Sequence, residues 1–203
     1  MNDRTRLRWK RFGLGVSAGF TLLVVFVMNI PLLFAPANTA RSDVILHLAS
    51  DARLQGDEYV ARLYKERLAA RVVCASSQIS WDVYPSDASC AHLIELGVPA
   101  EAVSVLHLPM TDCGAEVVPI LIEDLRALGA RSVLFVVDPT VTRYGEWRSR
   151  HRFAAAGIEA RTTFAPQDRE VMLDRWWRSH WKAQRIVGTL MNTTIDLLYA
   201  PCR

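Results

Sequence analysis

The sequence predicts a Rossmann-like α/β fold, a doubly wound and mostly parallel sheet of about five strands, preceded by one transmembrane helix. Three observations lead to this prediction. A long apolar run without charge lies near the N-terminus, short apolar runs then alternate with segments of helical spacing, and the connections between them are short. Such alternation is typical of βαβ units, in which helices cover both faces of a parallel sheet.

The N-terminal apolar run covers residues 13–35 and contains no charged side chain. A helix needs about 20 such residues to cross a bilayer. The basic tail at residues 1–12 predicts a cytoplasmic N-terminus, an inner (plasma) membrane location and a domain outside the cytoplasm. A cleaved signal peptide is the alternative, but the apolar part of a signal is usually only about 7–15 residues long. We therefore expect an uncleaved single-pass anchor that contacts the lipid bilayer through residues 13–35.

After a linker at residues 36–42, we expect the α/β domain at residues 43–165. Its predicted strands are residues 43–48, 71–75, 102–108, 132–137 and 158–163. Its predicted helices are residues 57–70, 86–96, 118–128 and 143–156. Gly97, Gly129 and Gly157 mark helix ends, and Pro119 suits the first turn of its helix. Strands covered on both faces should bury Ile45, Leu46, Val72, Val73, Val133, Leu134 and Val136.

The tail at residues 166–203 is expected to form an amphipathic, Trp-rich helix. It carries Trp176, Trp177 and Trp181, followed by aliphatic residues and interleaved with basic ones. We expect its aromatic stripe to pack on the domain. The alternative is a helix that lies on the outer membrane surface and uses Trp as an interfacial anchor.

Composition excludes several classes of protein. Hydrophobic residues make up 51% of the chain and charged residues 22%, which is typical of a folded domain. The net charge of +3 is too small for the dense basic face of a nucleic-acid-binding protein. The four cysteines form no CxxC pair, so no metal site is expected. In an oxidising compartment a disulfide among them is possible, and buried free thiols are the alternative.

Polar side chains follow the ends of the predicted strands. Open α/β sheets bind ligands beyond the carboxyl ends of their strands, where these loops meet. The candidate ligand-binding residues are Ser76, Thr111, Asp112, Asp138 and Arg143. In this hypothesis Arg143 pairs with an anionic group of the ligand, the two hydroxyls donate hydrogen bonds, and Asp112 orients Arg143 or accepts from a ligand hydroxyl.

Other polar residues have a more ordinary explanation. Asp57, Ser86 and Thr142 are expected to be helix N-caps, because Asp, Ser and Thr are preferred there. His47 and His107 lie within predicted strands, and we expect both to be core histidines with satisfied hydrogen bonds.

The order of short motifs resembles that of the YdcF-like family, which includes the SanA and ElyC types. The matching motifs are Asp43-Val-Ile, Leu63-Tyr64, Leu96-Gly97-Val98-Pro99, Thr111-Asp112, Val136-Val-Asp-Pro139 with Arg143, and Phe153 through Gly157-Ile158. Trp176-Trp177 and Leu197-Leu198-Tyr199 are similar to the C-terminal helix of the family. The polar positions that line the family's cleft correspond here to Ser76, Thr111, Asp112 and Arg143.

The chain also departs from the family pattern. The Gly-rich turn after the first strand is replaced by Leu48-Ala49-Ser50, and Ser-Gly-Gly after the second strand by Ala75-Ser76-Ser77. The family's Glu early in the helix before Leu96 has only loose counterparts in Asp82 and Asp87. Val141 stands where the family's His is expected, and an aliphatic side chain cannot act as a general base.

Two functions are compatible with these residues. The resemblance implies an extracytoplasmic protein of cell-envelope maintenance that acts on cell-wall or lipid-linked precursors, which are anionic. The alternative is a non-catalytic interaction or ligand-binding scaffold at the membrane surface, which the missing His and glycines favour. Neither the residues nor the resemblance names a cofactor.

Overall fold

A computed structural model describes residues 19, 21, 25, 27–49, 56–110, 114–165 and 172–199. The chain divides into two compact units, Met1–Phe34 and Ala35–Arg203. We describe each unit by itself.

The first unit ends in a short 3-10 helix, η1 (Ile30–Leu33), which follows helical residues at 27–29. Pro31 lies in the first turn of η1, where its missing N–H costs least. Residues 13–18, 20, 22–24 and 26 of the predicted membrane segment, and all of the basic tail at residues 1–12, lie outside the described residues. Within the part of the chain that is described, no helix has both the length and the apolar character needed to cross a bilayer. The transmembrane anchor therefore stays a prediction.

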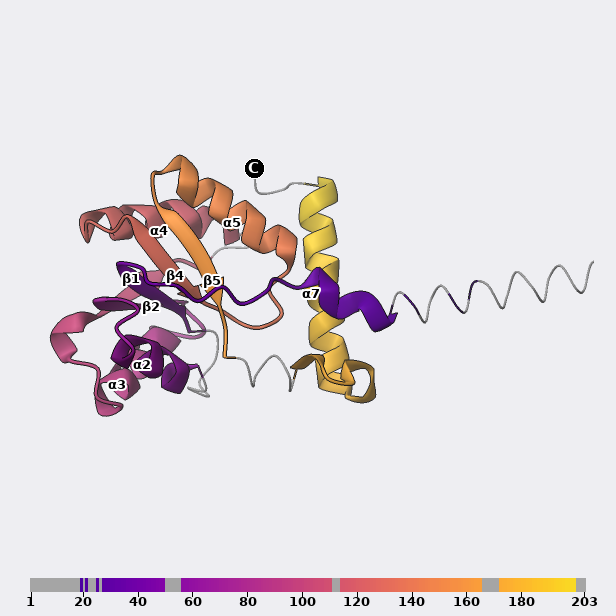
Figure 1. The fold of residues 1–203 in the computed structure, drawn as a ribbon, viewed down its shortest axis with the longest axis horizontal. Coiled ribbons are helices and arrows are strands. Elements are labelled where there is room, and N and C mark those ends of the chain that lie inside the picture. The colour runs from indigo at the N-terminus through magenta and orange to yellow at the C-terminus, as the bar shows by residue number, and fades with distance from the viewer. Residues whose placement is uncertain are drawn as a thin grey trace, which may run out of the picture. The chain divides into compact units, whose positions relative to one another are not determined.

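The second unit contains one five-stranded sheet in which every pair of neighbours is parallel. Its strands are β1 (Val44–Leu48), β2 (Arg71–Ser77), β3 (Val103–Leu108), β4 (Ser132–Val136) and β5 (Glu159–Thr163). The order across the sheet is β3-β2-β1-β4-β5, so the chain returns to the centre after β3 (Figure 1). This order confirms the predicted doubly wound parallel sheet and places a switch point between β1 and β4.

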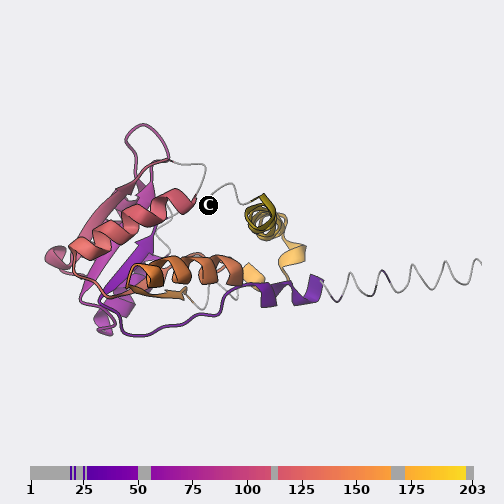
Figure 2. The ribbon, with the colours of Figure 1, turned by 90° about the horizontal axis from the view of Figure 1, so that it is seen from above.

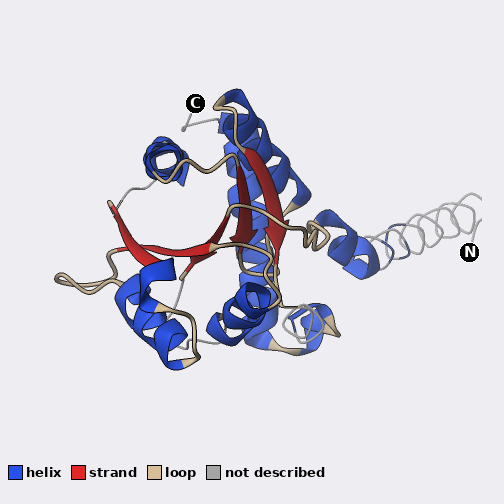
Figure 3. Ribbon diagram, turned by 60° about the vertical axis from the view of Figure 1, so that its left-hand side comes forward, coloured by secondary structure: helices blue, strands red, loops and turns tan. Residues whose placement is uncertain are grey.

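Helices cover both faces of the sheet, as Figure 3 shows. They are α2 (Asp57–Lys65), α3 (Pro85–Glu95), α4 (Gly114–Ala127) and α5 (Arg143–Ala155). One core lies between the sheet and α2 and α3, and includes Ile45, Val60 and Leu93. The other lies between the sheet and α4 and α5, and includes Leu46 and Leu125.

The predicted core residues are confirmed. Ile45, Leu46, Val72, Val73, Val133 and Leu134 are fully buried, and Val136 is 3% exposed. Successive residues of β1 point to opposite faces, so Ile45 enters one core and Leu46 enters the other. The aromatic rings of Phe135 and Phe153 meet edge to face at 5.0 Å and link β4 to α5.

Three elements differ from the sequence prediction. Helix α2 ends at Lys65 instead of residue 70, because Arg67 adopts a left-handed φ of 59°. Helix α4 begins at Gly114 instead of residue 118, which moves Pro119 out of the first turn and into the helix interior. Strand β3 is at the edge of the sheet, so His107 is exposed and is not a core histidine.

The expected N-caps have mixed outcomes. Thr142 caps α5 as predicted, since its hydroxyl accepts the Gly145 N–H at 3.1 Å. Asp57 is the first residue within α2 instead of its cap, and its carboxylate is buried. Ser86 is likewise inside α3, whose N-cap position is Tyr84.

The C-terminal segment forms η3 (Trp176–Arg178) and the long helix α7 (His180–Tyr199). Trp176 is buried, whereas Trp177 is 46% and Trp181 is 51% exposed. The three indoles are therefore not buried together, and the packing of the aromatic stripe on the domain stays a prediction. Residues 166–171 and 200–203 lie outside the described residues.

We expect Val136→Asp to prevent folding of the Ala35–Arg203 unit. Val136 is 3% exposed in a strand covered on both faces, and an unpaired buried carboxylate costs several kcal/mol against a total stability of about 5–15 kcal/mol. Val105→Asp is the matched control, because Val105 is 44% exposed on the edge strand β3. Circular dichroism melting of the purified full chain measures both. A cooperative transition for Val136→Asp at the wild-type temperature would contradict the two-layer core.

Candidate functional site

A cavity of about 520 Å³ opens at the carboxyl edge of the sheet, on the face covered by α4 and α5. We call it the carboxyl-edge pocket. Four strands line it at or just beyond their ends: Leu48 and Ala49, Ala75 to Ser77, Leu108, and Val137. Its volume lies within the range of small-molecule sites, about 300–1,000 Å³, and its position is that expected of ligand sites in open α/β sheets.

The described wall of the pocket is mostly apolar. Helix α4 contributes Val117, Val118 and Leu121, and α5 contributes Phe153 beside Gly145, Glu146 and Ser149. Hydroxyl groups come from Ser76, Ser77, Ser149 and Thr162. Glu146 is the only charged side chain among the described lining residues. A wall of this composition favours a largely apolar ligand with one or two hydrogen-bonding groups, and it disfavours an anion inside the pocket.

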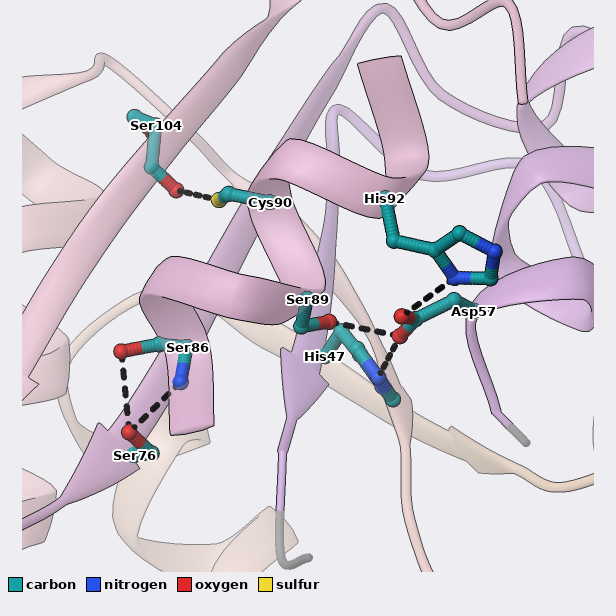
Figure 4. A network of polar contacts seen from close by, with 8 residues as sticks. All are labelled: His47, Asp57, Ser76, Ser86, Ser89, Cys90, His92 and Ser104. Atoms are coloured by element: carbon teal, nitrogen blue, oxygen red, sulfur yellow. Dashed lines mark hydrogen bonds and ion pairs between the residues drawn. The ribbon is translucent and has the colours of Figure 1, made fainter. Parts of the chain in front are cut away.

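Ser76 belongs to the pocket wall, but its hydroxyl group is already bonded (Figure 4). It donates to Ser86 Oγ at 2.9 Å and accepts the Ser86 N–H, also at 2.9 Å. The hydroxyl thereby supplies the acceptor that the first turn of α3 needs. Ser76 positions α3 against β2, and its hydroxyl is not free for a ligand.

The other predicted ligand-binding residues do not join Ser76 in the described wall. Asp138 accepts the N–H and the hydroxyl of Thr140, and it forms an ion pair with Arg185 of α7. Arg143, the first residue of α5, is exposed. Neither residue is among those lining the pocket. Thr111 and Asp112 lie outside the described residues, so their part in the site stays a prediction.

A second polar cluster surrounds the buried carboxylate of Asp57 (Figure 4). His47 Nε2, from the end of β1, lies 2.8 Å from Asp57 Oδ1. Ser89 Oγ donates to the same oxygen at 2.6 Å, and His92 Nδ1 lies 3.0 Å from Oδ2. We call these four residues the Asp57 cluster. It connects β1, α2 and α3 at the carboxyl edge of the sheet, on the face opposite the pocket.

The hydrogen bonds of the Asp57 cluster control the ionisation of the carboxyl group. Burial alone would raise the pKa of Asp57, but hydrogen bonds from His47, Ser89 and His92 outweigh it and hold the pKa below its ordinary value. An ionised carboxylate only accepts hydrogen bonds, so each imidazole presents an N–H to it. His47 Nδ1 is buried and has no hydrogen-bond partner among the described residues.

The cluster does not form a nucleophilic triad. In such a triad the histidine lies between the serine and the carboxylate, and it removes the proton of the serine hydroxyl. Here Ser89 donates directly to Asp57, and no hydrogen bond joins Ser89 to either imidazole among the described contacts. The arrangement stabilises a buried charge instead of activating a hydroxyl group.

Gly56 is required beside this cluster. A Cβ atom at Gly56 would lie 2.8 Å from His47 Cε1, closer than real contacts allow. Sequence reasoning missed the cluster, because it treated Asp57 as a cap and His47 as a core residue, and it did not consider His92. The available signal was the pair Ser89 and His92, which lie three residues apart and therefore share one face of a helix.

The described cysteines are free thiols. Cys74 and Cys90 are both buried. Their mutual hydrogen bond and burial raise the pKa of Cys74 well above its ordinary value, so this thiol stays protonated. The Cys90 thiol donates to the Ser104 carbonyl at 3.4 Å. Cys113 and Cys202 lie outside the described residues. No group of residues that could hold a metal ion occurs among those the structure describes.

Comparisons with known proteins add little to this geometry. No model of a protein family matches the chain, and no curated protein matches it. Among solved structures, the chain is similar to a universal stress protein in complex with cAMP, with 11% sequence identity and a TM-score of 0.40. The match covers 61% of this chain and 98% of that protein. A likeness this weak does not indicate a ligand for this chain.

We expect Asp57→Asn to lower the free energy of unfolding by about 2–4 kcal/mol. The amide group would turn an N–H toward a donor of the cluster and leave buried hydrogen-bonding groups unpaired. The wild-type pKa of Asp57 is lowered in the folded state, so its contribution is present above the unfolded value near 4 and lost as the pH falls through the folded pKa. The variant should therefore lose less stability than the wild type on acidification.

Asp87→Asn is the control for this measurement. Asp87 also lies 2.8 Å from an imidazole, that of His107, but both side chains are about half exposed, 52% and 46%. Exposed pairs contribute roughly 0–1 kcal/mol, so we expect little change. Urea unfolding at neutral and acidic pH measures both variants. Equal destabilisation by the two substitutions would contradict the special role of the buried carboxylate.

Proposed function

We propose that this chain is a single-pass membrane protein whose extracytoplasmic α/β domain binds a largely apolar small molecule in cell-envelope maintenance. The observation that carries the proposal is the carboxyl-edge pocket, with its volume of about 520 Å³ and its mostly apolar wall. The anchor and the envelope role rest on the apolar run at residues 13–35 and on the family resemblance.

Binding without turnover is the form of activity that the pocket supports best. Val141, which stands where the resembled family carries His, lines the pocket. An aliphatic side chain at that point can contact a ligand but cannot move a proton. The hydroxyl of Ser76 is bonded to Ser86, and among the described contacts no hydrogen bond joins Glu146 to a hydroxyl group of the wall.

The ligand class follows from the charges around the pocket. Glu146 disfavours an anion inside it, whereas Arg143 is exposed three residues earlier at the start of the same helix. A lipid or lipid-linked precursor of the envelope has an apolar chain and an anionic headgroup. In the proposed complex the apolar chain of the lipid occupies the pocket. The headgroup remains outside, within reach of Arg143.

Filling the pocket tests the proposal. Ser149 lies in the pocket wall on α5, and Ser149→Trp adds an indole ring to the cavity. We expect the wild-type full chain, purified from its membrane in mild detergent, to release a co-purified small molecule on organic extraction, detected by mass spectrometry. Ser149→Trp should reduce the amount by roughly tenfold or more, because the ring takes the volume of the apolar group.

Arg150→Trp is the matched control, since Arg150 is the next residue of α5, is exposed and does not line the pocket. It should retain the wild-type amount of ligand. Both variants must keep the wild-type melting temperature within a few degrees for the comparison to count. The proposal is wrong if both variants retain the same molecule, or if the wild type releases none.

Membrane topology is tested separately. The basic residues before residue 13 predict that the C-terminus lies outside the cytoplasm. Alkaline phosphatase fused after Arg203 should therefore be active, because that enzyme requires an extracytoplasmic location (its disulfides form only there). A green fluorescent protein fusion at the same point is the converse control. An inactive phosphatase fusion and a fluorescent control would reverse the predicted topology.

A further inference from the structure

Helix α7 turns its polar side chains toward the domain. Arg185 forms an ion pair with Asp138 in the loop after β4. Thr193 Oγ1 lies 3.3 Å from Thr142 Oγ1, and Asp196 lies 3.6 Å from Arg148 of α5. These contacts hold α7 beside the start of α5, and Figure 2 shows α7 end-on there. Ile186 is fully buried on the same side of α7, so both apolar and polar contacts attach the helix to the domain.

The opposite side of α7 is apolar and exposed. Val187, Met191, Ile195 and Leu198 follow one another at spacings of four, four and three residues, which places them on one helix face. They are 44%, 58%, 45% and 70% exposed. Trp181 at the start of α7 and Trp177 in η3 are also about half exposed. We call these six residues the α7 apolar face.

We propose that the α7 apolar face inserts into the interfacial layer of the lipid bilayer, so that α7 lies along the membrane surface. This inference rests on the membrane anchor of the proposed function. It adds a second attachment, which orients the domain relative to the membrane.

The composition of the surface around α7 favours a bilayer over a protein partner. Tryptophan is enriched at the depth of the headgroups, where its ring has an apolar body and a polar N–H. Arg175 and Arg178 are exposed on either side of Trp177. A basic border beside an apolar helix face is the pattern of helices that lie on anionic membranes.

The covalent link between the predicted membrane segment and the domain strengthens the contact of α7 with the bilayer. The predicted membrane segment ends at residue 35, where the Ala35–Arg203 unit begins. The anchor would therefore hold α7 at a high effective concentration next to the bilayer. Even weak insertion of four aliphatic side chains and two indoles is then sufficient for persistent contact.

Site-specific fluorescence in the full chain tests the inference. Ile195→Cys and Ile94→Cys form a matched pair, because Ile195 of α7 and Ile94 of α3 are the same residue type with 45% and 44% exposure. Each is introduced after Cys113→Ser and Cys202→Ser, with the buried Cys74 and Cys90 retained, and is labelled with the NBD fluorophore. Val25→Cys provides a third probe, located in the predicted membrane segment. The proteins are reconstituted in vesicles of phosphatidylcholine and phosphatidylglycerol, with and without doxyl-labelled phosphatidylcholine as a quencher.

We expect doxyl lipid to quench the probe at position 195 at least about twofold, with blue-shifted emission, while the probe at position 94 is unaffected. Emission at position 195 that is unshifted, or equal quenching at both positions, overturns the inference. A blue shift without quenching by doxyl lipid also overturns it, since it indicates burial of α7 against a second copy or another protein.

The probe at position 25 separates this inference from the proposed function. If position 25 is quenched and position 195 is not, the anchor is supported and the insertion of α7 is wrong. If position 195 alone is quenched, α7 binds membrane without a transmembrane anchor, and the proposed anchor is wrong. If neither is quenched, both are wrong.

Discussion

The burial of β1 on both faces is the constraint on which the Ala35–Arg203 unit depends. β1 pairs with β2 on one side and with β4 on the other, so its backbone groups are used along both edges. Ile45 enters the core under α2 and α3, and Leu46 enters the core under α4 and α5. A strand in this position has no side chain facing water. Any polar residue in it therefore requires a buried partner.

His47 is that polar residue, and the Asp57 cluster is the consequence. Its hydrogen bonds tie the end of β1 to α2 and α3, and they leave no space for a side chain at Gly56. The α2/α3 side of the carboxyl edge is thereby closed by polar contacts. The α4/α5 side is left open and apolar as the carboxyl-edge pocket. The fold thus places the hydrogen-bonded Asp57 cluster and the apolar carboxyl-edge pocket on opposite faces of one sheet.

The periodicity of the sequence was sufficient to predict the parallel sheet, because strands buried on both faces have a nearly continuous apolar pattern. The predicted central core, from Ile45 to Val136, was confirmed for the same reason. The local sequence pattern did not predict the hydrogen-bond partners of the polar residues. Ser76 lines the carboxyl-edge pocket, yet its hydroxyl bonds the first turn of α3, a partner that only the tertiary fold brings near. Asp57 was taken for a cap because its partners come from two other elements.

The position of β3 has a consequence for self-association. As one of the two edge strands, it has no strand partner along one side among the described residues, and its exposed side chains include Val105. Such an edge is a template for a strand from another molecule. Near the end of β3, His107 stacks on Tyr84 at 3.9 Å and contacts Asp87. We expect the charged Asp87 beside the end of this edge strand to disfavour the addition of a strand from a neighbouring chain.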